Sequence, residues 1–213
     1  VVDQALLNAL PALEVIASYS AGLDNVDLGA VHARGIRIRN SSHILEGEVA
    51  NLAIALLLGL TRDLVGADAF VRKGAWAGGR SYPLGRSVIG MRVGIIGLGA
   101  IGSAVAGRLQ ALGAVVAYTG PRAKPVDLPY HPDIRALARA SDALIVACPL
   151  SDDTRHVVDA AVLQALGPEG YLINVSRGPV VDETALIAAL AQNRIAGAGL
   201  DVFASEPHVP AAL

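Results

Sequence analysis

The sequence has little cysteine, a modest share of charge, and no strongly basic or acidic region. Cys148 is the single cysteine among 213 residues, so no disulfide can form within the chain and a reducing compartment, the cytoplasm, is expected. Charged residues make up 17% and the formal net charge is -2, which argues against non-specific binding to nucleic acid. We therefore expect a cytoplasmic protein whose partners are not nucleic acids.

Long apolar runs are scarce as well. The most apolar stretch, VANLAIALLLGL at 49–60, is too short to span a bilayer and contains Asn51. The first residues, VVDQALLNAL, have no basic segment and an early Asp3, unlike a secretory signal peptide. No association with a membrane is expected.

The chain is rich in apolar residues, which make up 53% of it and form short continuous runs. After residue 92 the runs RVGIIGL, AVVAYT, ALIVAC, YLINVS and AGAGLDVF alternate with amphipathic segments such as SAVAGRLQALG. Continuous apolar strands are buried on both faces, as in a parallel sheet covered by helices. Residues 67–213 are therefore predicted to form an α/β fold, a doubly wound parallel sheet of the Rossmann type.

Residues 1–66 are predicted to form part of a second, smaller α/β domain. Within them LEVIAS and IRIRN are typical of strands, and VDLGAVHAR between them is typical of a helix closed by Gly35. A long helix is expected from about residue 46 to residue 64. It is apolar on nearly every side, so it should be buried between domains or against another subunit.

A glycine motif, GLGAIG at 97–102, follows the predicted strand RVGII and opens the predicted helix SAVAGRLQAL. In this context G-x-G-x-x-G is a dinucleotide-binding fingerprint, although a turn with packing glycines is the alternative. The first glycine permits a tight turn, the second lets the backbone approach a pyrophosphate, and the third lets helix and strand pack closely. The helix N-terminus offers unpaired N–H groups to the phosphates. The predicted contacts are Gly97, Gly99, Ala100, Ile101 and Gly102.

The second strand of the predicted domain lacks the acidic residue that usually binds a ribose hydroxyl. VVAYTGPRAKP at 115–125 has Arg122 about 20 residues after Gly102, where that acid is expected. An arginine there can pair bidentately with a 2′-phosphate, which an acid would repel. The alternative is that Arg122 and Lys124 are solvated loop charges, but the missing acid favours NADP (NADPH) as cofactor. The predicted contacts are Thr119, Gly120, Pro121 and Arg122.

A resemblance to a known family is carried by INVSRGPVVDETALIAALAQNRIAGAGLDVFASEP, residues 173–207. This stretch resembles the D-isomer-specific 2-hydroxyacid dehydrogenases, closest to the glyoxylate/hydroxypyruvate reductase branch, including hydroxyphenylpyruvate reductases. The resemblance continues in SAGLDNVD at 20–27, GIIGLGAIG at 94–102 and VACPLSDDTRHVV at 146–158. It implies a flavodoxin-like substrate domain built from both chain ends, incomplete in this chain, and a homodimer that acts on a small 2-oxo or 2-hydroxy acid.

The resemblance also implies roles for individual residues. Arg177 matches the arginine that binds the substrate carboxylate and carbonyl oxygen, and Glu206 matches the glutamate that orients a catalytic histidine. Ala21 and Gly22 match the loop whose N–H groups hold the carboxylate. The positions that match cofactor-lining residues are Cys148, Pro149, Val175 and Asp201. The chemistry agrees, because a 2-oxo acid needs a planar bidentate cation and a proton donor. No metal is implied.

The catalytic histidine itself is not expected among the five histidines present. His208 in EPHVPAAL fills a variable position of the family's EP-x-VP-x-x-L segment, and the proline–histidine turn is expected beyond Leu213. On this resemblance the chain corresponds to an internal part of the family's sequence. Two alternatives stay open: an NAD-linked relative such as a phosphoglycerate or formate dehydrogenase, which the missing acid disfavours, and a dinucleotide-sensing corepressor that binds without turnover.

Overall fold

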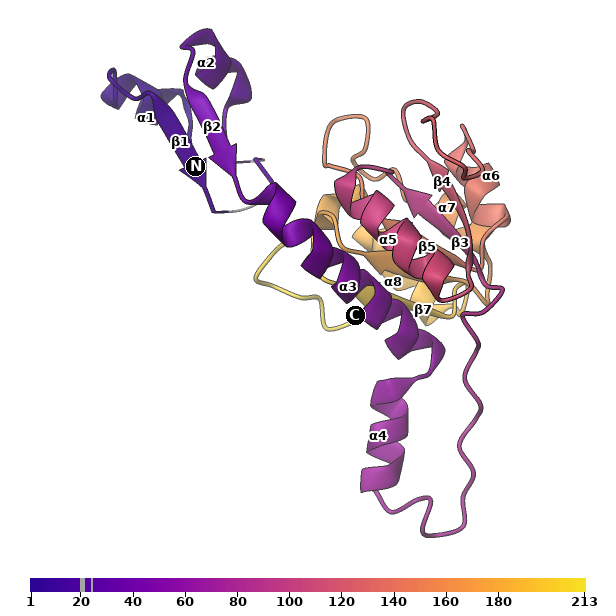
Figure 1. The fold of residues 1–213 in the computed structure, drawn as a ribbon. Coiled ribbons are helices and arrows are strands. Elements are labelled where there is room, and N and C mark those ends of the chain that lie inside the picture. The colour runs from indigo at the N-terminus through magenta and orange to yellow at the C-terminus, as the bar shows by residue number, and fades with distance from the viewer. Residues whose placement is uncertain (20–21, 24) are drawn as a thin grey trace. The chain divides into compact units, whose positions relative to one another are not determined.

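A computed structural model describes residues 1–19, 22–23 and 25–213 of the chain (Figure 1). These residues form two compact units, Val1–Glu48 and Val49–Leu213. The boundary between the units lies inside a long helix, whereas the sequence predicted a functional division after residue 66. That assignment of residues 1–66 to a substrate domain stays a prediction.

The first unit is a small α/β structure. Its two parallel strands are β1 (Val15–Ser18) and β2 (Arg37–Asn40), and its helices are α1 (Gln4–Ala9) and α2 (Leu28–Ala33). Gly35 follows α2 with a φ of 66°, a conformation that glycine adopts without strain. The predicted strand–helix–strand order is therefore confirmed for this unit. Its core consists of Leu7, Val26, Val31 and Ile36.

The long helix α3 (Ser42–Thr61) begins before the predicted start near residue 46. It ends because the chain turns at Asp63, which has a φ of 46°, into the unpredicted helix α4 (Leu64–Arg72). The prediction of a segment too short for a bilayer concerned only residues 49–60. By length and composition the longer stretch Ile44–Thr61 could cross a membrane, with a mean hydropathy of 1.6. The core helix of a soluble protein meets the same criterion.

Within the second unit, α3 packs on the sheet. Ala50, Ala53 and Leu57 are fully buried in the same cluster as strand residues such as Ile173. A Cβ built on Gly199 of the edge strand would lie 3.0 Å from the Leu56 Cβ, so the glycine lets helix and strand approach closely. One side of this half of α3 is therefore part of the core of the second unit.

The second unit is a five-stranded parallel sheet in the order β4-β3-β5-β6-β7. Its strands are β3 (Arg92–Ile96), β4 (Val115–Thr119), β5 (Ala143–Val146), β6 (Tyr171–Asn174) and β7 (Gly197–Leu200). The central strands are almost wholly buried, as their continuous apolar runs predicted. The predicted doubly wound parallel sheet is confirmed.

Helices cover both faces of this sheet. One face carries α3 and α5 (Ala100–Ala111). The other carries α6 (Ile134–Arg139), α7 (Ala160–Leu166) and α8 (Glu183–Ala191). In chain order β3 is the first strand of this five-stranded sheet, and it has β4 on one side and β5 on the other. The strand order therefore reverses at β3. In such sheets ligands bind in the crevice at the carboxyl ends of the strands beside this reversal.

Candidate active site

The glycine motif forms the turn from β3 into α5. Gly97 has a φ of 95°, and a Cβ on it would lie 2.7 Å from the Cα of Cys148. A Cβ on Gly102 would lie 2.1 Å from the carbonyl oxygen of Gly97. Neither position accommodates a side chain, so both glycines are required by the packing of the turn.

The middle glycine of the motif has a different environment. A Cβ on Gly99 would meet no atom within 4 Å, so the space over this backbone is open to a ligand. Gly99 is also the N-cap of α5, and no side chain caps the helix. The first-turn N–H groups of Ala100 and Ile101 lie where an anion is stabilised by the helix dipole. The turn therefore fits a pyrophosphate.

The end of β4 lies directly beside this turn. The Gly97 N–H donates to the Thr119 carbonyl oxygen at 3.0 Å. Arg122 follows on an exposed loop, and within the part of the chain that the structure describes its guanidinium makes no ion pair or hydrogen bond. A cation that is exposed and uncompensated beside a pyrophosphate site can bind a further phosphate.

Lys124, the second cation of this loop, is already engaged. Its Nζ donates to the carbonyl oxygen of Leu98 inside the glycine turn. Its backbone N–H donates to the Tyr118 hydroxyl at 2.7 Å. The two cations of this loop, separated by one residue in the sequence, therefore have different surroundings, and Arg122 is the one with no protein partner among the described residues.

The predicted substrate arginine follows the end of β6. Asn174, which is 1% exposed, donates from Nδ2 to the Arg177 carbonyl oxygen at 3.0 Å and accepts from the Ser176 N–H at 3.0 Å. The Arg177 Nη1 donates to the Ser176 carbonyl oxygen at 2.7 Å. Asn174 thus shapes the turn that carries the arginine. Sequence reasoning did not assign it a role, although a buried amide at a strand end, in INVSRG, is the signal that would have found it.

The turn that carries Glu206 packs against the Arg177 turn. A Cβ on Gly178, in the short 3-10 helix η1 (Gly178–Val180), would lie 2.0 Å from the Phe203 carbonyl oxygen. The Glu206 Oε1 accepts from the Phe203 N–H at 2.9 Å, which closes the turn. The two predicted catalytic residues therefore lie on segments in direct backbone contact.

The predicted cofactor-lining positions end neighbouring strands. Val175 donates its N–H to the Val146 carbonyl oxygen at 3.3 Å, and Asp201 donates its N–H to the Asn174 carbonyl oxygen at 3.0 Å. Cys148 and Pro149 follow β5, next to the glycine turn. The backbone of these residues lies at the carboxyl edge of the sheet, and the turn that carries Arg177 follows β6 at the same edge.

Two of the predicted substrate contacts are not among the residues of the second unit. Ala21 lies outside the described residues, and Gly22 is half-buried in the first unit. Their role in holding a carboxylate stays a prediction. Among the described residues, no group of three or more His, Cys, Asp and Glu side chains could hold a metal ion.

The thiol of Cys148 is not a nucleophile in the native chain. Burial raises its pKa to about 11. Since the thiolate is the reactive form, we expect iodoacetamide at about pH 8 to label Cys148 at least about tenfold more slowly in the native chain than in urea. Mass spectrometry of the two samples gives the rates. Equal labelling rates would contradict a buried, neutral thiol.

The glycine turn at the strand-order reversal and the uncapped helix behind it define a dinucleotide-binding α/β protein. Residues 54–213 match the family model of the D-isomer specific 2-hydroxyacid dehydrogenase, NAD binding domain. The chain belongs to this family, and this part of it is its nicotinamide dinucleotide-binding domain.

Two named relatives match almost the whole of this chain. The chain is 48% identical over 209 residues to glyoxylate/hydroxypyruvate reductase A of Arabidopsis thaliana and 46% identical over 209 residues to hydroxyphenylpyruvate reductase of Plectranthus scutellarioides. Each match covers 98% of this chain and 66% of the relative, so the chain spans about two thirds of their length.

A similar solved structure is the NADPH-dependent glyoxylate/hydroxypyruvate reductase of Sinorhizobium meliloti in complex with NADP and malonate. It has a TM-score of 0.91 and 46% sequence identity, over 98% of this chain and 66% of that one.

Proposed function

We propose that the protein transfers a hydride from NADPH to a small 2-oxo acid, of the glyoxylate or hydroxypyruvate type, to give the D-2-hydroxy acid. The observation that carries this proposal is the exposed Arg122 without a protein partner in the described structure, beside a glycine turn that fits a pyrophosphate. The names of the relatives support the substrate class. The single, buried cysteine suits a cytoplasmic enzyme.

Each part of the site has a role in this proposal. When bound, NADPH supplies the hydride. The glycine turn and Arg122 hold its phosphates, and Cys148, Pro149, Val175 and Asp201 line the cofactor along the strand ends. Arg177 binds the substrate carboxylate and polarises the carbonyl, with Ala21 and Gly22 holding the same carboxylate. Glu206 orients the histidine that donates the proton.

The test is the oxidation of NADPH and of NADH by the intact enzyme, followed by absorbance with a panel of 2-oxo acids. We expect glyoxylate and hydroxypyruvate to be reduced, with NADPH preferred. Activity with NADH and phosphohydroxypyruvate, or with NAD and formate, would identify an NAD-linked relative instead. Tight cofactor binding without turnover of any acid in the panel would identify a sensor.

We also propose a homodimer. It is held by α3 and by the arm that follows it, which consists of α4 and the segment between α4 and β3. Only 22% of Ile44–Thr61 is buried within the chain. Figure 1 shows α4 and the segment after it reaching away from the sheet. Trp76 is 72% exposed and Leu84 is 99% exposed. Exposed apolar surface of this extent is covered when a second copy presents the same surface across a two-fold axis.

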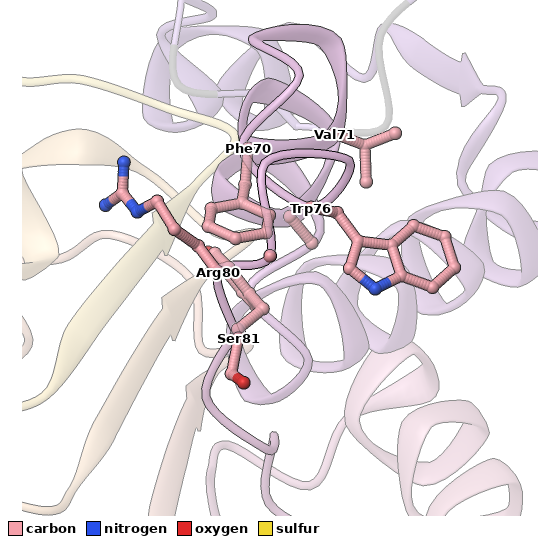
Figure 2. Close-up of a pocket in the computed structure, with 8 residues that line it drawn as sticks. Phe70, Val71, Trp76, Arg80 and Ser81 are labelled. Carbon is pink, nitrogen blue, oxygen red and sulfur yellow. The ribbon is translucent and has the colours of Figure 1, made fainter.

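The arm has a defined shape before any partner binds. It contains an open pocket of about 460 Å³ beside Phe70. Figure 2 shows Val71 and Trp76 on one side of the Phe70 ring and the Arg80 guanidinium on the other, 5.7 Å from the ring centroid. The Tyr82 ring lies 4.9 Å from the Phe70 ring. These contacts keep the arm ordered while Trp76 stays outward.

The double variant Trp76→Asp/Leu84→Asp is expected to be a monomer at micromolar concentration, by light scattering, because both side chains are exposed in the isolated chain. A buried apolar side chain contributes about 1.5–3 kcal/mol, and a two-fold axis doubles the loss. Leu6→Asp, at a position 41% exposed in the first unit, is the matched control and should stay dimeric. A double variant with the mass of the unmodified dimer would exclude the arm as the interface.

A further inference from the structure

The loop that carries Arg122 is fixed on both sides of the arginine by tyrosine hydroxyls. The Tyr130 hydroxyl donates to the Gly120 carbonyl oxygen at 2.9 Å. The Lys124 N–H donates to the Tyr118 hydroxyl at 2.7 Å. Gly120 and Lys124 each lie two residues from Arg122, so the two bonds bracket the arginine symmetrically.

Both tyrosines are themselves firmly held. Tyr118 is 1% exposed and lies in the main core of the second unit, within β4. The ring centroids of Tyr118 and Tyr130 are 5.3 Å apart. Tyr118 also receives the His131 N–H on its carbonyl oxygen at 2.9 Å and donates its N–H to the Pro129 carbonyl oxygen at 3.0 Å. The loop thus returns to the strand that it leaves.

A third connection ties the loop to the glycine turn. Lys124 reaches back with its Nζ to the Leu98 carbonyl oxygen, and Leu98 is 4% exposed. The loop is therefore attached to both the strand and the turn that face the cofactor, while the Arg122 side chain stays exposed. An arginine on an unattached loop would lose backbone entropy when it bound a phosphate, and this loop has already lost most of it.

We propose that Tyr118 and Tyr130 are positioning residues for cofactor choice, whose hydroxyls hold the loop Gly120–Lys124 so that Arg122 meets a 2′-phosphate with little further ordering. This inference rests on the proposed pairing of Arg122 with that phosphate. It assigns the preference for NADPH to two hydroxyl groups as well as to the charge. A dinucleotide without the 2′-phosphate does not use Arg122, so its affinity should depend little on either hydroxyl.

The test measures binding by titration calorimetry, without catalysis, for NADPH, NADH and 2′,5′-ADP as a probe of the phosphate alone. One hydrogen bond is worth a factor of about 3 to 10 in affinity. Tyr130→Phe should therefore lower the affinity for NADPH and for 2′,5′-ADP by that factor, and the affinity for NADH by less than about twofold. Tyr118→Phe should act in the same direction. Tyr171→Phe is the control, since Tyr171 lies on β6 and its ring packs against Arg86, away from this loop. It should leave the affinities for all three ligands unchanged.

The variant Arg122→Ala separates this inference from the proposed function. In its background Tyr130→Phe should have no further effect on the ratio of NADPH to NADH affinity, since the loop then positions nothing. If Arg122→Ala leaves the ratio unchanged, the phosphate pairing fails and the inference fails with it. If Arg122→Ala lowers the ratio but both tyrosine variants leave it intact, or weaken NADPH and NADH equally, the positioning role alone is overturned.

Discussion

Replacement of Arg177 by alanine is expected to lower kcat/KM for a 2-oxo acid by a factor of about 10³ to 10⁵. Removing one donor that stabilises a developing oxyanion costs a factor of about 10² to 10³ in kcat. The lost charged hydrogen bonds to the substrate carboxylate cost about 1.5–3 kcal/mol in addition, and the acid loses its orientation. The measurement is steady-state reduction of glyoxylate or hydroxypyruvate by the intact enzyme, with Arg177→Lys for comparison.

The lysine variant should recover only part of the loss, because an ammonium lacks the planar pair of donors that a carboxylate accepts. Affinity for NADPH should stay within about twofold in both variants, since Arg177 is assigned to the acid and not to the cofactor. Activity of Arg177→Ala within about tenfold of the unmodified enzyme would remove Arg177 from the proposed site.

Gly102→Ala is expected to destabilise the second unit and to abolish tight binding of the cofactor. The added Cβ would lie 2.1 Å from the Gly97 carbonyl oxygen, a backbone atom that cannot move without opening the turn. Overpacking of a well-packed interior costs about 1–3 kcal/mol or more. We expect a loss of at least about 2 kcal/mol in urea unfolding, and a loss of NADPH affinity of at least about tenfold.

Gly107→Ala is the matched control for this prediction. Gly107 lies in the same helix and is exposed. A Cβ on it would meet no atom within 4 Å apart from the neighbouring backbone of its own helix. Alanine is favoured over glycine inside a helix by about 0.5–1 kcal/mol, so this variant should gain stability and bind NADPH normally. Equal behaviour of the two variants would mean that Gly102 is present for helix flexibility and not for the contact.

The parts of the fold that follow from local pattern were predictable. The continuous apolar runs of β3 and β5 predict burial on both faces of the sheet, and the glycine motif predicts the turn between β3 and α5. Gly35 marks the end of α2 because a left-handed residue is needed there. In each case the signal and the structure depend on neighbouring residues.

The parts that depend on distant contacts were not predictable. The separation of helix α4 from α3 required knowledge of the turn at Asp63. The roles of Asn174 and Tyr130 appear only when the chain brings a side chain to a remote carbonyl group. Periodicity and motif spacing carry no information on such bonds. The different surroundings of Arg122 and Lys124 are of the same kind, since two cations separated by one residue gave one signal in the sequence.

The most direct test of the central claim is the affinity of this chain for NADPH and for NADH, measured side by side by calorimetry. A charged hydrogen bond from Arg122 to the 2′-phosphate is worth about 1.5–3 kcal/mol, so NADPH should bind about 10- to 150-fold more tightly. Arg122→Ala should remove most of that difference, and acidification below about pH 6, which protonates a phosphate monoester, should reduce it. Equal affinities, or tighter binding of NADH, would contradict the account.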